Sequence, residues 1–309
     1  MKLRLIRDAE AVALLDLDRA YNVIRDAYVQ AATMGPVLST PSAQLMRHPS
    51  APMVAMKVKG AQLPHQRVAG FRFVGDFEAE TGEISHDFQL LTNMDTAAPY
   101  AIVEMLTLHG VRTAITGVVA LEAYRGARCD VITIIGAGRI AEHVVCVLRH
   151  RLNPHEIRVV ASRPARAEMF AARHNVVPFA SIDAAMDGAD AAISITSANE
   201  PILFSHHLHA GITLIGMGGS HECDISVLNA ADQFYVDDID YACVSGSLGA
   251  WVRRGEVTRA TAQARVCGEL GQVAAGQIAV SRTSTDRLFA IVQGMACCDL
   301  ALAADIASR

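Results

Sequence analysis

A glycine-rich turn between an apolar strand and an amphipathic helix is the feature that most limits how this chain can fold. The stretch reads VITIIGAGRIAEHVVCVL and occupies residues 131–148. Gly136 can make the tight turn, Gly138 leaves the backbone open to a pyrophosphate, and the small Ala141 lets the helix lie close to the sheet. The motif therefore predicts a dinucleotide-binding βαβ unit. The alternative is a purely structural glycine turn.

Helices and strands alternate after residue 130, which indicates a doubly wound parallel sheet of the Rossmann type, and thus an α/β fold class. The expected strands are short apolar runs at 131–135, 157–161, 191–195, 213–217 and 234–238.

The preceding part of the chain predicts a second, α+β domain. Apolar residues at helical spacing indicate a helix over 16–35 and another from about 106 to 124. Short runs rich in valine and phenylalanine, separated by turn-forming residues, favour an antiparallel sheet. These strands are expected at 53–59, 70–76 and 86–92.

Composition excludes several classes of partner. The net charge is -5 with no lysine or arginine block, which argues against nucleic acid. No apolar run approaches the roughly 20 residues that cross a bilayer, so no membrane partner is expected. The charged start, MKLRLIRDAEAV, does not suit a signal peptide, and the seven cysteines are odd in number and lack a CxxC motif. We therefore expect a cytoplasmic protein with a small-molecule partner.

The only histidine cluster in the sequence follows residue 201. His206, His207 and His209 lack the thiol or carboxylate neighbours that a zinc site needs. We predict no metal.

The end of the second Rossmann strand bears on the choice of nicotinamide cofactor. NAD-specific sites usually place an acid there, about 20 residues after the glycine turn, to hold the ribose 2′-hydroxyl. This chain has Ala161, Ser162 and Arg163 instead. A hydroxyl and a guanidinium can bind the 2′-phosphate that an acid would repel, so NADP(H) is favoured over NAD(H). The alternative is that Ser162 and Arg163 begin the next helix and face water.

Several further motifs give the chain a resemblance to the ornithine cyclodeaminase and mu-crystallin family over nearly its whole length. The matching stretches are VRTA at 111–114, GAGRIA at 136–141, SITS at 194–197 with PIL at 201–203, ECD at 222–224, VDD at 236–238 and GMACCDL at 294–300.

The resemblance implies a division of the chain into two functional domains. A substrate-binding and dimerisation domain is expected over 1–125, completed by a C-terminal helix at 287–309. The NAD(P)-binding Rossmann domain is expected over 126–286. The family is typically homodimeric and carries out NAD(P)-linked chemistry at an amino-acid carbon.

The resemblance also implies site residues. Arg112 matches the arginine that binds the substrate carboxylate. The family's GxK lysine is replaced here by Arg72, which can anchor a carboxylate but stays protonated and is a poor proton donor. The implied cofactor contacts are Thr113, Gly136, Gly138, Arg139, Ile140, Thr196, Ser197 and Met217.

Lys57 and Lys59 are the candidates for the missing proton donor. A strand places both on one face, and antiparallel pairing with 70–76 would bring one of them beside Arg72. A partly desolvated ammonium among arginines would have its pKa lowered toward neutrality, which suits acid–base work. The alternative is that both lysines reach solvent from the face of the sheet.

These observations predict an NAD(P)H-dependent reductase that converts an imino acid to an amino acid and works in reverse as an amino-acid dehydrogenase. One alternative is an ornithine-type cyclodeaminase with tightly bound NAD. The segment 216–225 is shorter than the stretch that carries the catalytic aspartate in cyclodeaminases, which weakens this alternative. The other alternative is a non-catalytic, mu-crystallin-like protein that binds a small ligand.

Overall fold

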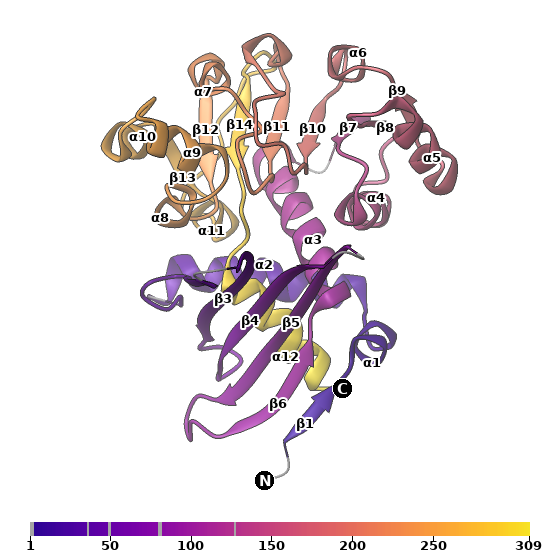
Figure 1. The fold of residues 1–309 in the computed structure, drawn as a ribbon. Helices are drawn as coiled ribbons and strands as arrows, with labels where there is room; N and C mark the ends of the chain where they lie inside the picture. The colour runs from indigo at the N-terminus through magenta and orange to yellow at the C-terminus, as the bar shows by residue number, and fades with distance from the viewer. Residues whose placement is uncertain (1–2, 36, 49–50, 80–81, 127) are drawn as a thin grey trace. The chain divides into compact units, whose positions relative to one another are not determined.

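The computed structural model describes the chain except for residues 1–2, 36, 49–50, 80–81 and 127. The chain forms two compact units, one of residues 1–112 with 295–309 and one of residues 113–294. Each unit is built around its own sheet (Figure 1).

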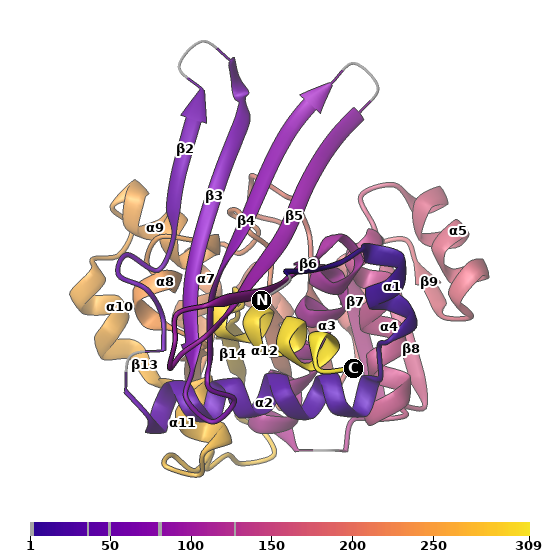
Figure 2. The same cartoon turned by 90° about the horizontal axis from the view of Figure 1, so that it is seen from below.

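A six-stranded sheet, in the order β1-β6-β5-β4-β3-β2, dominates the first unit. Its strands are β1 (Arg4–Ile6), β2 (Gln44–His48), β3 (Ala51–Leu63), β4 (Val68–Ala79), β5 (Gly82–Asn93) and β6 (Pro99–Glu104). Neighbouring strands are antiparallel except for β1 and β6, which are parallel. Strands β2 to β5 run side by side in Figure 2. The predicted antiparallel sheet is present, and β1, β2 and β6 extend it beyond the three expected strands.

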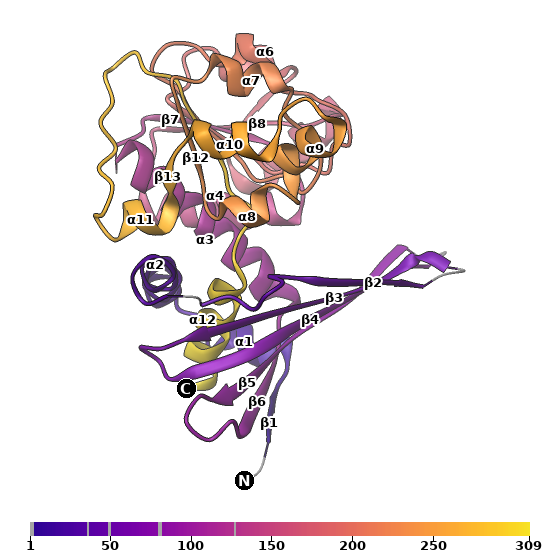
Figure 3. The ribbon, with the colours of Figure 1, turned by 90° about the vertical axis from the view of Figure 1, so that its left-hand side faces the viewer.

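Helices cover one face of this sheet. They are α1 (Asp8–Ala13), α2 (Leu17–Thr33) and α12 (Ala296–Ala307). Helix α12 packs against α2 and against β3, β4 and β5, as Figure 3 shows. Helix α2 begins where the Asp16 side chain accepts a hydrogen bond from the Arg19 N–H at 3.1 Å. It buries Tyr21, Ile24 and Tyr28, as its apolar spacing predicted.

An eight-stranded parallel sheet, in the order β13-β12-β14-β11-β10-β7-β8-β9, forms the centre of the second unit. Its strands are β7 (Val131–Ile135), β8 (Glu156–Val160), β9 (Val177–Phe179), β10 (Ala191–Ser194), β11 (Thr213–Gly216), β12 (Gln233–Val236), β13 (Val266–Glu269) and β14 (Leu288–Ile291). The five strands expected here are all present. The strand order reverses between β7 and β10, which makes this the topological switch point of a doubly wound sheet.

The helices of the second unit follow the strands along the chain. They are α4 (Arg139–Arg151), α5 (Pro164–His174), α6 (Ile182–Met186), η1 (Ser205–His207), α7 (Ile225–Ala230), α8 (Ile239–Ala242), α9 (Gly246–Arg254), α10 (Arg259–Arg265) and α11 (Leu270–Ala274). Helix α3 (Leu106–Arg125) contains the boundary between the units, which falls after Arg112. Among the described helices, none has both the length and the apolar character needed to cross a membrane.

The C-terminal segment differs from its prediction as a helix over 287–309. Helix α12 begins only at Ala296, whereas Leu288–Ile291 form β14, a strand of the parallel sheet. A short apolar run is compatible with either a helix or a buried strand. Here the run forms a strand that pairs with β11 on one side and β12 on the other.

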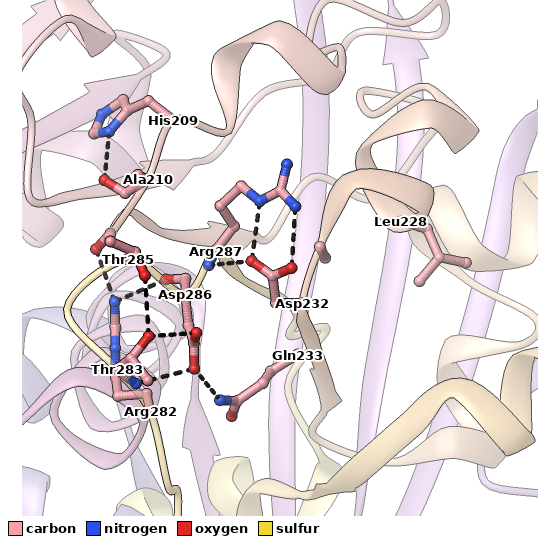
Figure 4. Close-up of polar contacts among 12 residues, drawn as sticks. His209, Ala210, Leu228, Asp232, Gln233, Arg282, Thr283, Thr285, Asp286 and Arg287 are labelled. Carbon is pink, nitrogen blue, oxygen red and sulfur yellow. Dashed lines mark hydrogen bonds and ion pairs between the residues drawn. The ribbon is translucent and has the colours of Figure 1, made fainter.

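Hydrogen bonds and an ion pair stabilise the loop that leads into β14 (Figure 4). The Arg287 guanidinium donates two hydrogen bonds of 3.0 Å to the Asp232 carboxylate, which lies just before β12. The Gln233 side chain donates to Asp286 at 3.1 Å, and Arg282 donates to the Thr213 hydroxyl at the start of β11 at 2.6 Å. These contacts help to hold β14, the last strand in the sequence, between β11 and β12.

Candidate functional site

A pocket of about 330 Å³ opens at the carboxyl ends of β7, β8 and β10 in the second unit. Its lining includes the glycine turn 136–138, residues 160–162 at the end of β8 and residues 195–198 after β10. Isolated side chains from outside these three segments complete the lining; they are Ile135, Arg166, Ile182 and Ile202. Open parallel sheets bind ligands at this edge, at the switch point, so the pocket is a candidate nucleotide site.

The glycine turn has the geometry that a dinucleotide requires. Gly136 has a φ of +117°, and a Cβ at this position would lie 2.5 Å from the Ile195 carbonyl oxygen, so only glycine fits. A Cβ at Gly138 would meet no described heavy atom within 4 Å, which leaves the backbone at the start of α4 open to a ligand. The turn therefore fits a pyrophosphate lying on the N-terminus of α4.

Half of the predicted cofactor contacts line this pocket. Those in its lining are Gly136, Gly138, Ser162, Thr196 and Ser197. Those outside its lining are Thr113, Arg139, Ile140, Arg163 and Met217. The cofactor-binding roles of all ten residues stay predictions. Arg166, Ile182 and Ile202 were not predicted, because a lining residue on a helix or a loop has no local signature in the sequence.

A buried carboxylate supports the wall of the pocket. Glu222 is 1% exposed and accepts hydrogen bonds from the Ser194 hydroxyl, the Thr196 hydroxyl and the Gly218 N–H, each 2.7 Å long. Burial raises the pKa of Glu222 above its usual value, although the three hydrogen bonds oppose the shift. Because Thr196 lines the pocket, Glu222 fixes the loops that follow β10 and β11. The sequence showed this residue only as part of the ECD motif.

A cluster of buried charges lies on the helix-covered face of the sheet in the first unit. Lys59 on β3 and Arg72 on β4 are directly opposite each other in the strand pair, and they are 8% and 3% exposed. Arg72 donates from Nε and Nη2 to Asp87 on β5, at 2.8 and 2.5 Å. The two strands on either side of β4 therefore supply the neighbours of Arg72.

Asp299 on α12 connects the two arginines of the cluster. It is fully buried and accepts hydrogen bonds from Arg112 Nε at 2.6 Å and from Arg72 Nη1 at 3.2 Å. Although burial favours the neutral acid, the charges of Arg112 and Arg72 lower the pKa of Asp299 well below its usual value. Asp299 belongs to the GMACCDL motif, but its pairing with Arg72 and Arg112 could not be predicted from the sequence.

His109 completes the cluster on the first turns of α3. Its Nδ1 lies 3.0 Å from Arg112 Nη2, and because an arginine N–H can only donate, Nδ1 accepts and the ring proton belongs on Nε2. Burial and the charges of Arg72 and Arg112 lower the pKa of His109 well below its usual value. The ring is therefore neutral near pH 7.

The cluster carries more positive than negative charge. Its described members are three cations, Lys59, Arg72 and Arg112, and two carboxylates, Asp87 and Asp299, so the sum is one positive charge with His109 neutral. Such an excess favours a small anion such as a carboxylate. Lys57, by contrast, lies opposite Val74 and is partly exposed.

Three side chains elsewhere approach one another as metal ligands could. The ring Nε2 atoms of His206 and His207 each lie 3.2 Å from the Asp183 carboxylate. His207 Nδ1, however, accepts a hydrogen bond from the Phe204 N–H at 3.0 Å, so Nε2 carries the proton and donates it to Asp183. A protonated nitrogen does not bind a metal, and the predicted absence of a metal stays a prediction.

Comparison with known proteins gives matches along the whole chain. The model of the ornithine cyclodeaminase/mu-crystallin family matches residues 5–309. The mouse ketimine reductase mu-crystallin is 27% identical over 193 residues, which cover 60% of this chain and 58% of that relative, so the match spans little more than half of the relative's length.

Solved structures share the fold. An archaeal alanine dehydrogenase dimer with bound NAD has a TM-score of 0.85 at 19% identity, with 100% of this chain and 96% of that chain covered. The Δ1-pyrroline-2-carboxylate reductase of Thermococcus litoralis, in complex with NADH and L-proline, has a TM-score of 0.86 at 16% identity, with 99% and 96% covered.

Proposed function

This chain belongs to the ornithine cyclodeaminase/mu-crystallin family, and we propose that it is an NAD(P)H-dependent reductase of imino acids that works in reverse as an amino-acid dehydrogenase. The observation that carries the proposal is the buried cluster of Lys59, Arg72 and Arg112 with its excess of positive charge. The names of the mouse and Thermococcus relatives, a ketimine reductase and a pyrroline-carboxylate reductase, support the same reaction class.

The arginines of the cluster bind the substrate carboxylate in this proposal. Asp299 contacts both guanidiniums and Asp87 contacts Arg72 through two hydrogen bonds, so the arginine side chains are held in place before substrate arrives. Neutralising the carboxylate makes the adjacent imine carbon more electron-poor and thus a better hydride acceptor.

Lys59 supplies or holds the proton on the substrate nitrogen. It is buried beside Arg72, and its ammonium carries protons that it can exchange with the substrate. Arg72 cannot take this role because a guanidinium stays protonated. Lys57 is the weaker of the two lysine candidates, since it is partly exposed and faces Val74 across the strand pair.

The second unit binds the nicotinamide cofactor, which supplies the hydride when it is present. Gly136 and Gly138 receive the pyrophosphate at the start of α4, and Thr196 and Ser197 contact the cofactor from the loop after β10. NADP(H) is favoured over NAD(H), because the described lining of the pocket contains neither Asp nor Glu.

We also propose that the protein is a homodimer. Strand pairing puts Leu5, Met46, Phe71 and Phe88 on the outer face of the first unit's sheet, opposite to the face that carries Arg72. They are 47%, 47%, 54% and 37% exposed. An apolar face of this kind across a sheet suits contact with a second copy, and the archaeal alanine dehydrogenase is described as a dimer.

A cytoplasmic location is a further part of the proposal. All seven cysteines are unpaired in the structure, including the adjacent Cys297 and Cys298. Free buried thiols suit a reducing compartment.

The test is a panel of 2-oxo acids with ammonia or methylamine, and of cyclic imino acids, each assayed with NADPH and with NADH. A reductase consumes reduced cofactor in proportion to the substrate added. A cyclodeaminase releases ammonia from a diamino acid with no net change in cofactor absorbance, and this result would favour the first alternative. If neither assay detects a reaction and the protein still binds the cofactor, the result would favour the second alternative, a non-catalytic protein that binds a small ligand.

A further inference from the structure

We propose that Arg166 makes this chain select a cofactor that carries a phosphate on the adenosine 2′-oxygen. The inference rests on the proposed function, since it concerns the same nicotinamide cofactor. Arg166 is the one charged side chain in the described lining of the pocket at the carboxyl ends of β7, β8 and β10. A single cation in a lining of otherwise neutral residues is a binding partner for a phosphate rather than for a neutral hydroxyl.

A hydrogen bond holds Arg166 next to the glycine turn. The Nε–H of Arg166 donates to the carbonyl oxygen of Ala137 at 3.2 Å, and Ala137 stands between the two glycines of the turn. Arg166 itself lies in the first turn of α5, the helix that follows β8. The guanidinium is therefore held where the glycine turn meets the end of β8, the place where a Rossmann fold puts the ribose of the adenosine half.

The residues at the end of β8 leave room for a phosphate. Ser162 is the lining residue at the position where an NAD-specific site has an acid that binds the 2′-hydroxyl. A carboxylate there would repel a 2′-phosphate, whereas the Ser162 hydroxyl can donate to it. Arg166 and Ser162 together offer a planar charged donor and a hydroxyl to one phosphate group.

Arg163 is the rival for this role, and the sequence alone favoured it. It stands at the N-cap of α5 and is outside the lining of the pocket, although both arginines are exposed. Arg166, one helical turn later, points back to the glycine turn through its bond to Ala137. The pocket lining and the bond to Ala137 therefore assign selectivity to Arg166 rather than to Arg163.

Two adenosine nucleotides test the proposal without substrate or turnover. Adenosine 2′,5′-bisphosphate and 5′-AMP differ only in the 2′-phosphate, and their affinities for the full chain can be measured by calorimetry. The wild type should prefer the bisphosphate. Arg166→Gln should lower the affinity for the bisphosphate roughly 10- to 100-fold, the loss expected for a hydrogen-bonded charge pair, and change that for 5′-AMP little.

Variants of two other arginines at the same helix distinguish a specific role of Arg166 from a role of Arg163 and from a general loss of positive charge. Arg163→Gln tests the rival, and Arg173→Gln, an exposed arginine at the other end of α5, controls for loss of positive charge. Thermal unfolding of each variant checks that the fold is intact, and Arg166→Lys should keep part of the preference. The proposal is overturned if the wild type has no preference, if Arg163→Gln alone removes it, or if Arg166→Gln weakens both nucleotides equally. Because no imino acid is involved, these outcomes are independent of whether the reductase assay succeeds.

Discussion

Lys59 on β3 lies directly opposite Arg72 on β4, and both side chains are buried. Like charges that face each other across a strand pair destabilise a sheet unless anions compensate them. Asp87 and Asp299 both hold Arg72, so the sheet keeps two cations side by side on one face. Such an arrangement has a clear use if an anionic substrate binds there and one cation exchanges a proton.

Replacing Lys59 should therefore greatly reduce catalysis, whereas replacing Lys57 on the same strand should not. We expect Lys59→Met to lower kcat about 10²- to 10⁴-fold, the usual contribution of a positioned acid–base group. Lys57→Met, two residues away on the same face, should change kcat less than about 3-fold, since Lys57 is partly exposed. Steady-state kinetics on the best substrate of the panel provide the measurement, and equal losses in the two variants would show that neither lysine has a specific role.

Replacing Asp299 should lower the free energy of unfolding by a large amount. Asp299→Asn leaves Arg72 and Arg112 buried with less compensating charge, which should cost about 3–5 kcal/mol of unfolding free energy. Asp305→Asn is the matched control on α12, because its partners Arg19 and Arg309 are 57% and 22% exposed, so both stay in contact with water and each pair contributes about 1 kcal/mol or less. Urea denaturation gives both values. A loss for Asp299→Asn as small as that of the control would contradict the bridging role.

Asp237 should contribute stability that is lost as the pH rises from about 4 to 6. Burial raises the pKa of Asp237 from 3.8 to about 6, although the backbone N–H groups of Gln293 and Gly294 oppose the shift. Between these values Asp237 binds more protons in the folded state than in the unfolded state, so its contribution to the free energy of unfolding decreases by about 3 kcal/mol across the window. Asp237→Asn cannot titrate, and its denaturation midpoints between pH 4 and pH 7 should lack this decrease. Parallel pH profiles for the two proteins would refute the assignment.

Glu222 should act on cofactor binding rather than on the substrate. Glu222→Ala removes the acceptor of the Ser194 and Thr196 hydroxyls and of the Gly218 N–H, so the loops that shape the pocket lose their common anchor. We expect roughly 10-fold weaker NADPH binding, equivalent to about 1.4 kcal/mol, by fluorescence titration. Glu200→Ala, an exposed acid in the loop after β10, serves as the control. Unchanged NADPH affinity in Glu222→Ala would limit this residue to a structural role.

The outer face of the first unit's sheet should govern self-association. Phe71→Glu places a charge in the middle of the exposed apolar face and should convert a dimer into a monomer in sedimentation velocity. Met169→Glu introduces the same charge at an exposed methionine of α5 and should leave association unchanged. A monomeric wild type, or a dimeric Phe71→Glu, would exclude this face as the interface.

Local patterns were enough to predict the framework of both units. The strand at 131–135, the turn at Gly136 and the helix after Gly138 follow from apolar runs and from a backbone angle that only glycine adopts readily. The alternation of strands and helices after residue 130 gave the parallel sheet for the same reason. β14 escaped prediction because a four-residue apolar run is ambiguous until its neighbours are known.

The sequence by itself determined the two kinds of sheet, the position of the glycine turn and the set of cations from which a substrate site could be built. Only the tertiary structure decided which of these residues meet. It set Lys59 rather than Lys57 against Arg72, put Arg166 rather than Arg163 in the pocket, and brought Asp299 to arginines 187 and 227 residues away along the chain. The physical reason is that periodicity fixes the face on which a side chain lies, whereas strand register and helix packing fix what stands opposite to it.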